Sequence, residues 1–232
     1  MNADFLAQMI GETGPIHNMV LIIALVLMAI AAGILIMEIL GYTITNKGIV
    51  KHNFKWNARA VAIAAICAAV YIALVPFSIA WIPGIGGFTP ARALPAIFGA
   101  IFGLPGMIGT TFSMPIGDAI SGKLTLGSIA GFLAQVYVTW IPYKLVKDPS
   151  MRNFKSIATF FLWGIFIAPL IISIMVPGWL DFMNVIPAAV AWGGVWPAFI
   201  ISYMISPIVI SPLLLLVIYP LVRKLGLFHR DI

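Results

Sequence analysis

Long apolar stretches separated by short polar segments make up most of the chain. Four of them have about the length, near 20 residues, at which a helix crosses a bilayer; they run from about His17 to Tyr42, Ala58 to Trp81, Leu126 to Val146 and Phe154 to Val176. Apolar residues make up 62% of the 232 and charged residues only 9%, with a mean hydropathy of +1.10. A soluble domain of this size has too little interior for so much apolar surface. The pattern therefore predicts an all-α membrane protein that crosses the bilayer repeatedly.

Two further apolar stretches do not fit a single ordinary span. Residues 92–120 are interrupted by many glycines and prolines. Because Pro105 is followed directly by Gly106, we predict two short helices that meet at GLPGM, rather than one tilted helix. Residues 185–222 would be roughly 57 Å long as one helix, against a hydrocarbon core near 30 Å. Their first part, VIPAAVAWGGVWPAF, is expected to form either an interfacial or re-entrant piece or an ordinary aromatic belt.

Basic residues set the expected orientation. Of the 13 lysines and arginines, all but Arg92 and Lys123 fall on one side of the membrane if residues 92–120 form two spans. A single helix there would move the basic cluster at 144–155 to the other side and remove the asymmetry. Because basic residues concentrate in cytoplasmic loops, we predict seven spans in the cell membrane, with the N-terminus outside and the C-terminus in the cytoplasm.

Few residues have the chemistry of a catalytic or metal site. The single cysteine, Cys67, lies in an apolar run, and His17, His52 and His229 fall at span edges or tails. These positions argue against a zinc or haem site. The sequence has no Walker motif, HExxH or paired intramembrane carboxylates. We therefore expect no enzymatic activity, cofactor, metal or nucleic-acid partner, since the basic charge is accounted for by orientation in the lipid bilayer.

From about Arg59 onward, the order of features matches that of a known family. An alanine-rich helix, RAVAIAAICAAVYIALVPF, is followed by a glycine- and proline-rich outer loop and by the paired short helices. The segments LTLGSIAGFLAQVYVTWIPYKL and SPLLLLVIYPLVRKLGL come next. This order resembles the substrate-binding S components of energy-coupling factor (ECF) vitamin transporters over about three quarters of the chain. The resemblance implies a six-helix bundle at residues 51–232, with an extra helix and a basic inner loop in residues 1–50.

The resemblance also implies a function and partners. S components capture a vitamin-like small molecule outside the cell and release it inside when a coupling membrane subunit and two ATPase subunits act on them. A rival interpretation is a structural or assembly subunit of a larger membrane complex, with the extra helix as a docking element. Glu38, near the inner end of that helix, is expected to snorkel, with pairing to a basic loop residue as the alternative.

Small residues recur at every fourth position of the alanine-rich helix, where they permit close helix packing. Spacing alone favours packing within this chain, whereas the resemblance implies docking of the coupling subunit. The two adjacent rows are Ala60, Ala64 and Ala68, and Ala65, Ala69 and Ala73.

The outer loop supplies the first candidate substrate residues. In the resembling family the loop equivalent to WIPGIGGFTPAR closes over the substrate, which implicates Trp81. Arg92 either attracts a carboxylate or phosphate or anchors the chain at the interface. Asp118 has three possible roles, which are to brace the turn SGKLTLG through backbone N–H groups, to pair with Lys123 or to contact substrate. Bracing is the favoured one.

Further candidates come from the later spans. Gln135 lies halfway along its span and must find a partner there, so it is a candidate for the pocket floor. Aromatic walls with a few polar groups suit a flat, partly apolar small molecule. The last segment offers Asn184, Trp192, Trp196 and Tyr203 for such walls.

Overall fold

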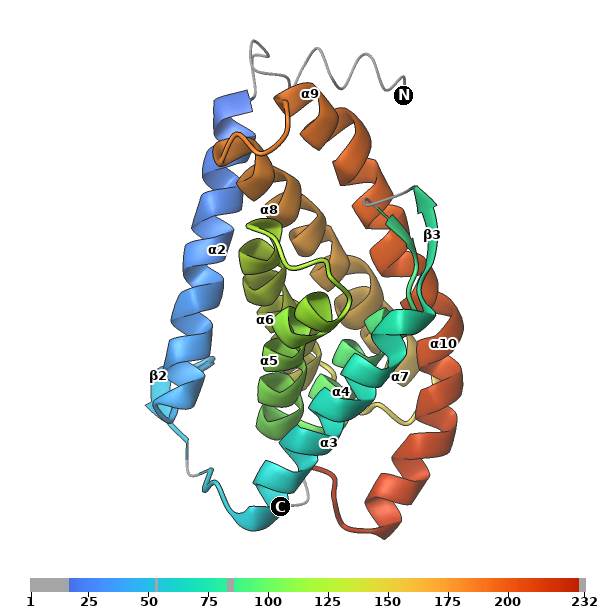
Figure 1. The fold of residues 1–232 in the computed structure, drawn as a ribbon. Coiled ribbons are helices and arrows are strands. Elements are labelled where there is room, and N and C mark those ends of the chain that lie inside the picture. The colour runs from blue at the N-terminus through green and yellow to red at the C-terminus, as the bar shows by residue number, and fades with distance from the viewer. Residues whose placement is uncertain (1–16, 53, 83–85, 230–232) are drawn as a thin grey trace.

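The computed structural model describes residues 17–52, 54–82 and 86–229, and its long helices pack side by side into a bundle (Figure 1). Two short hairpins lie on opposite sides of this bundle (Figure 1). The α-helices of the first half are α2 (His17–Ile39), α3 (Ala58–Leu74), α4 (Leu94–Phe102), α5 (Leu104–Ile120) and α6 (Gly127–Leu145). Those of the second half are α7 (Phe154–Phe160), α8 (Ala168–Phe182), α9 (Ala188–Val190) and α10 (Trp196–Lys224).

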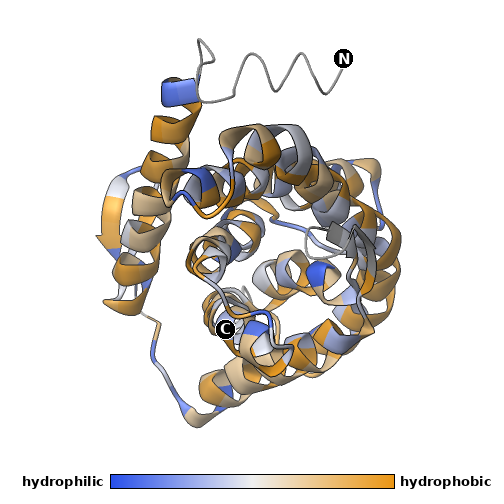
Figure 2. Cartoon of the chain, turned by 45° about the horizontal axis from the view of Figure 1, so that its top comes forward, coloured by the Kyte–Doolittle hydropathy of each residue, from blue (hydrophilic) through white to orange (hydrophobic). Residues whose placement is uncertain are grey.

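Within the described residues, four helical segments are long and apolar enough to cross a membrane; they are His17–Ile39, Ala58–Phe77, Phe154–Phe182 and Ala188–Lys224. Their outward sides carry large apolar side chains such as Ile22, Ile66 and Val217, each more than half exposed. Apolar colour extends along the outer helices in a view tilted by 45° from that of Figure 1 (Figure 2). A helical membrane protein, as the hydropathy pattern predicts, accounts for this exposure because lipid covers such surfaces.

The apolar stretch at residues 92–120 forms two helices, as predicted. Gly103 separates α4 from α5 with a φ of +61°, a conformation that favours glycine. A Cβ atom on Gly106 would lie 2.2 Å from the Phe98 carbonyl oxygen, so the two helices meet through close backbone contact. The chain reverses at this point, since Arg92 before α4 and Asp118 near the end of α5 line the same cavity.

The last apolar stretch is helical from Ala188 to Lys224. A wide π-type turn at Ala191–Val195 joins α9 to α10, and Figure 1 shows the combined helix running along one side of the molecule. The helix is continuous over these residues, so they do not form a separate re-entrant piece. A second π-type turn at Phe161–Ile167 joins α7 to α8 in the same way. Such turns insert a residue without ending the helix.

Both loops that flank α3 contain hairpins that the hydropathy pattern did not predict. Strands β1 (Tyr42–Thr45) and β2 (Gly48–Lys51) pair in the basic loop, with Gly48 at a φ of +96°. Strands β3 (Ile79–Ile82) and β4 (Gly86–Phe88) pair in the glycine- and proline-rich loop that was predicted to lie outside. Each strand has four residues or fewer, which is too short for a clear alternating pattern.

Helix α2 packs against α6 and α8 as part of the bundle. Glu38 near its end is 1% exposed and does not snorkel. Its Oε1 atom lies 2.9 Å from the Lys144 ammonium and accepts hydrogen bonds from Trp140 Nε1 at 2.8 Å and Thr43 Oγ1 at 2.7 Å. The expectation of snorkelling was therefore wrong, because α6 brings a basic residue and an indole to the carboxylate.

The opposite end of α2 is also fixed by a carboxylate. Asp181, at the end of α8, is 6% exposed, and its Oδ2 atom lies 2.8 Å from His17 Nε2. The same oxygen accepts a hydrogen bond from Trp192 Nε1 at 2.8 Å. Midway along α2, the Tyr137 hydroxyl donates to the Leu27 carbonyl at 2.9 Å. Helix α2 is thus attached to the bundle at both ends and at its middle.

Candidate functional site

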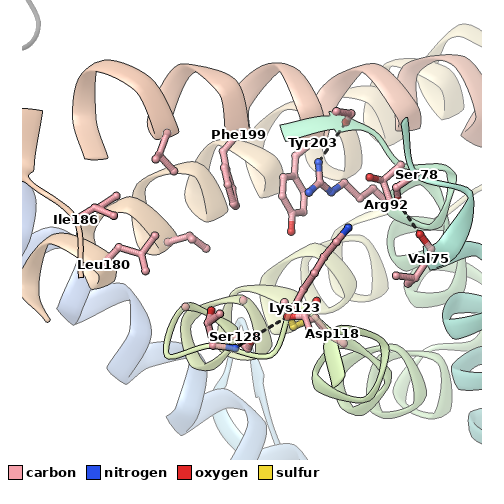
Figure 3. Close-up of a pocket in the computed structure, with 18 of the residues that line it drawn as sticks. Val75, Ser78, Arg92, Asp118, Lys123, Ser128, Leu180, Ile186, Phe199 and Tyr203 are labelled. Carbon is pink, nitrogen blue, oxygen red and sulfur yellow. Dashed lines mark hydrogen bonds between the residues drawn. The ribbon is translucent and has the colours of Figure 1, made fainter. Parts of the chain in front are cut away.

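A cavity of about 440 Å³ lies between the outer-loop hairpin, the end of α5, the start of α6, and helices α8 and α10 (Figure 3). Three of the predicted substrate residues line it, namely Arg92, Asp118 and Tyr203. They come from segments far apart in sequence, so the fold brings these three together.

Arg92 is held at the cavity wall by contacts with α10. Its Cζ atom lies 4.2 Å from the centre of the Tyr203 ring and 5.9 Å from that of Phe199. The Nη1 atom donates hydrogen bonds to Ser202 Oγ and, at 3.5 Å, to the Gly87 carbonyl. Cation–π contacts at these distances stabilise the guanidinium orientation by roughly 0.5–2 kcal/mol. The side chain is therefore fixed in place beside the cavity.

Asp118 braces the turn between α5 and α6, which was the favoured prediction. It does so through the Ser128 side chain and not through backbone N–H groups. Ser128 Oγ donates to Asp118 Oδ2 at 2.7 Å and accepts from the Thr125 backbone N–H at 3.2 Å. Among the ion pairs of the described residues, none joins Asp118 to Lys123. The carboxylate also lines the cavity, so bracing and contact with substrate are compatible at this position.

Lys123 lines the same cavity and was not among the predicted substrate residues. Its ammonium group extends from the turn towards Arg92 and Tyr203 (Figure 3). The signal was present in the sequence, because Lys123 and Arg92 were the two basic residues assigned to the outer side. Tyr71, Leu180, Ile186 and Phe199 also line the cavity, and nothing in the local sequence pattern marked them.

Three other predicted residues lie away from the cavity lining. Gln135 is 2% exposed inside the bundle, and its Nε2 atom has no hydrogen-bond partner among the described residues. Trp192 is 1% exposed and bonded to Asp181, and its ring centre lies 6.5 Å from that of Trp196. The two tryptophans thus pack where α9 meets α8 and α2 rather than on the cavity wall.

The remaining two predicted substrate residues are Asn184 and Trp81. Asn184 is exposed in the turn after α8, with a φ of +51° that asparagine tolerates better than most residues. Trp81 belongs to strand β3, but its side chain lies outside the part of the chain that the structure describes.

Serine hydroxyls on α10 attach the outer-loop segment beside the cavity. The backbone N–H of Gly87 donates to Ser202 Oγ at 3.0 Å, and that of Thr89 donates to Ser206 Oγ at 3.1 Å. The two serines are four residues apart and therefore share one face of the helix. Since Gly87 and Thr89 line the cavity, these bonds fix one of its walls.

The two alanine rows of α3 have different surroundings. Ala60 is buried, and Ala64 and Ala68 are half-buried. The Ala64 carbonyl would lie 2.2 Å from a Cβ atom on Gly109 of α5, so this row packs inside the chain. The second row, Ala65, Ala69 and Ala73, is exposed. Of the two alanine rows, only the second is open on the surface of α3.

A second hollow, of about 460 Å³, lies at the opposite end of the bundle, where Phe102 and Leu104 flank the break between α4 and α5. Lys55 and Arg59 line it, and none of the predicted substrate residues does. The first cavity is therefore the candidate functional site.

Comparison of the chain with protein-family models, with curated proteins and with solved structures gave no match.

Proposed function

We propose that this protein captures a small nutrient outside the cell, as the substrate-binding S component of an ECF-type transporter. The observation that carries the proposal is the cavity lined by Arg92, Asp118 and Lys123 and flanked by the outer-loop hairpin. A cavity of about 440 Å³ has the size of a small-molecule site, and a few polar groups on mostly apolar walls are typical of one.

The proposal includes seven crossings, with the cavity end outside. The reversal at Gly103 returns the chain to the cavity end, so that Arg92 and Lys123 lie together, as the charge assignment requires. Contacts between basic segments support a common opposite end. Arg59 of α3 donates to the Gly226 carbonyl, and Lys144 lies near Thr43 of β1. An excess of basic residues at that end favours a cytoplasmic location in a cell-membrane protein.

The proposed partners are a coupling membrane subunit and two ATPase subunits. The exposed row Ala65, Ala69 and Ala73 supports this, because small residues let a partner helix approach closely. The same surface would serve the rival role of an assembly subunit in a larger membrane complex. The cavity distinguishes the two, since an assembly subunit has no need of a substrate.

The decisive experiment is to purify the full chain from cells grown in rich medium and to identify retained small molecules by mass spectrometry. We expect one water-soluble compound at near-stoichiometric amount, released on unfolding. The rival role predicts a reproducibly empty protein that co-purifies with membrane subunits of another complex. That result would contradict substrate capture.

A further inference from the structure

The candidate cavity carries an excess of positive charge. Arg92 and Lys123 line it together with one carboxylate, that of Asp118. One oxygen of this carboxylate is engaged by the Ser128 hydroxyl at 2.7 Å. Two cations and one anion leave the lining with one net positive charge. A bound molecule that carries one negative charge would balance it.

Hydrogen-bond donors at this end of the cavity are unused. The side chain of Lys123 makes no hydrogen bond or ion pair with any described residue, and Arg92 uses only its Nη1 atom. The hydroxyls of Tyr71 and Tyr203 have no hydrogen-bond partner in the described part of the chain, although both residues line the cavity. Figure 3 shows the Lys123 ammonium and the Tyr203 hydroxyl directed into the same space. This end is therefore suited to a group that only accepts hydrogen bonds.

The other end of the cavity is apolar. Leu180 and Ile186 lie across the space from Arg92 and Lys123, with Phe199 between the two ends (Figure 3). The Phe199 ring stacks on that of Tyr203, with centres 5.6 Å apart and planes at 27°. An apolar body bound along these side chains would remove them from water, which favours binding.

We propose that the cavity binds a small monocarboxylate with an apolar body. The carboxylate lies between Arg92 and Lys123, and the apolar part follows Phe199 towards Leu180 and Ile186. Charge-assisted hydrogen bonds from guanidinium and ammonium groups are the strong ones, and a carboxylate accepts several at once. A cationic molecule would increase the net positive charge of the cavity. A dianionic phosphate would carry more negative charge than is needed to balance it. This assignment rests on the proposed role in substrate capture and specifies its substrate class.

The test compares three probes that differ only in their head group: 4-phenylbutanoate, 4-phenylbutanamide and 4-phenylbutylamine. The full chain is placed in nanodiscs of zwitterionic lipid, and binding is measured by equilibrium dialysis at millimolar probe, with empty nanodiscs subtracted. We expect the acid to bind and the amide to bind at least about tenfold more weakly, because the amide lacks the charge. The amine should stay at background.

Variants of Lys123 make the assignment specific, because this side chain makes no hydrogen bond or ion pair within the described residues. Lys123→Gln should weaken binding of 4-phenylbutanoate roughly three- to tenfold, the loss of one charge-assisted contact at a partly exposed site. Lys123→Glu should abolish binding of the acid and raise that of the amine. Lys47→Gln is the matched control, because Lys47 lies in the β1–β2 hairpin, away from the cavity. It should change the binding of neither the acid nor the amine. Thermal unfolding should be the same for all three variants.

Equal binding of acid and amide, binding of none of the probes, or acid binding that is unchanged in Lys123→Gln would overturn the assignment. The outcome is separable from that of the capture proposal. If the purified protein retains a neutral or cationic compound, capture stands and the monocarboxylate is refuted. A protein that retains nothing refutes capture, and with it this assignment.

Discussion

At the scale of single residues, two buried carboxylates determine the position of helix α2 in the bundle. Glu38 and Asp181 each accept an indole N–H, and each lies 2.8–2.9 Å from the nitrogen of a basic or imidazole side chain. A buried carboxylate persists only where such partners offset its loss of hydration. The sequence shows that Glu38 is costly in an apolar helix. It does not show Lys144 as the partner, because that residue lies on α6, far along the chain.

Removing the charge at Glu38 should therefore destabilise the protein. Glu38→Ala leaves the Lys144 ammonium half-buried without its carboxylate, which we expect to cost about 3 kcal/mol. The double variant Glu38→Leu with Lys144→Met should cost less than the single change, because no charge is left unpaired. Thermal unfolding of the purified protein measures both, and Lys47→Gln serves as an exposed control. Equal stability of Glu38→Ala and wild type would show that the pair contributes nothing.

The dual role of Asp118 can be separated by one conservative change. Asp118→Asn keeps an oxygen that accepts the Ser128 hydroxyl, so stability should fall by less than about 1 kcal/mol. Ser128→Ala removes the hydroxyl that links Asp118 to the Thr125 backbone and should cost about 1 kcal/mol or more. If Asp118 serves only as a brace, retention of the co-purified compound should be unchanged in Asp118→Asn. A loss of retention without a loss of stability would instead show contact with substrate.

At the scale of elements, the contact between α4 and α5 depends on one glycine. A Cβ atom on Gly106 would lie 2.2 Å from the Phe98 carbonyl oxygen, which belongs to rigid helix backbone. Gly106→Ala should therefore cost about 2–3 kcal/mol through overpacking. Gly33→Ala is the matched control, because a Cβ atom there would meet nothing within 4 Å and alanine favours a helix by up to about 1 kcal/mol. Unfolding midpoints that shift equally in the two variants would contradict this account of the contact.

The elements also show what sequence patterns can and cannot predict. The Pro105–Gly106 pair located the break to within a few residues of Gly103, because backbone preferences are local. The sequence left open whether the first part of the last stretch forms a separate piece. The helix is continuous from Ala188 to Lys224, since a π-type turn accommodates Gly193 and Gly194 without ending it. One alanine row is packed inside the chain and the other is exposed because of the position of α5. The spacing of alanines along α3 gives no information about that position.

At the scale of the whole molecule, the cavity end and the basic end should face opposite sides of the membrane. The single cysteine, Cys67, is 1% exposed, so introduced cysteines can be labelled over a low background. We expect a membrane-impermeant maleimide to label Lys123→Cys in intact cells and Lys47→Cys only after permeabilisation. The reverse pattern would invert the orientation, and labelling of both in intact cells would contradict the proposed number of crossings.

The candidate site was only partly predictable at this scale. Arg92, Asp118 and Tyr203 share the cavity, and charge or aromatic character marked each of them in the sequence. Gln135 and Trp192 carry the same kind of signal but are used in packing. Chemical type therefore identified polar residues in an apolar chain, whereas only the arrangement of α5, α6, α8 and α10 determines which of them line the cavity.

The two carboxylate contacts of α2 also provide an optical readout. Trp140 and Trp192 donate their indole N–H groups to Glu38 and Asp181, one at each end of the helix. An indole beside a charged acceptor emits at a different wavelength from one surrounded by hydrocarbon. Trp140 therefore reports whether Glu38 of α2 is in place, and Trp192 reports the surroundings of Asp181, which binds His17 at the other end of α2. The chain has seven tryptophans, so each reporter is read in a variant whose other six are replaced by phenylalanine, which lets fluorescence follow the two ends separately as the bundle moves in the bilayer.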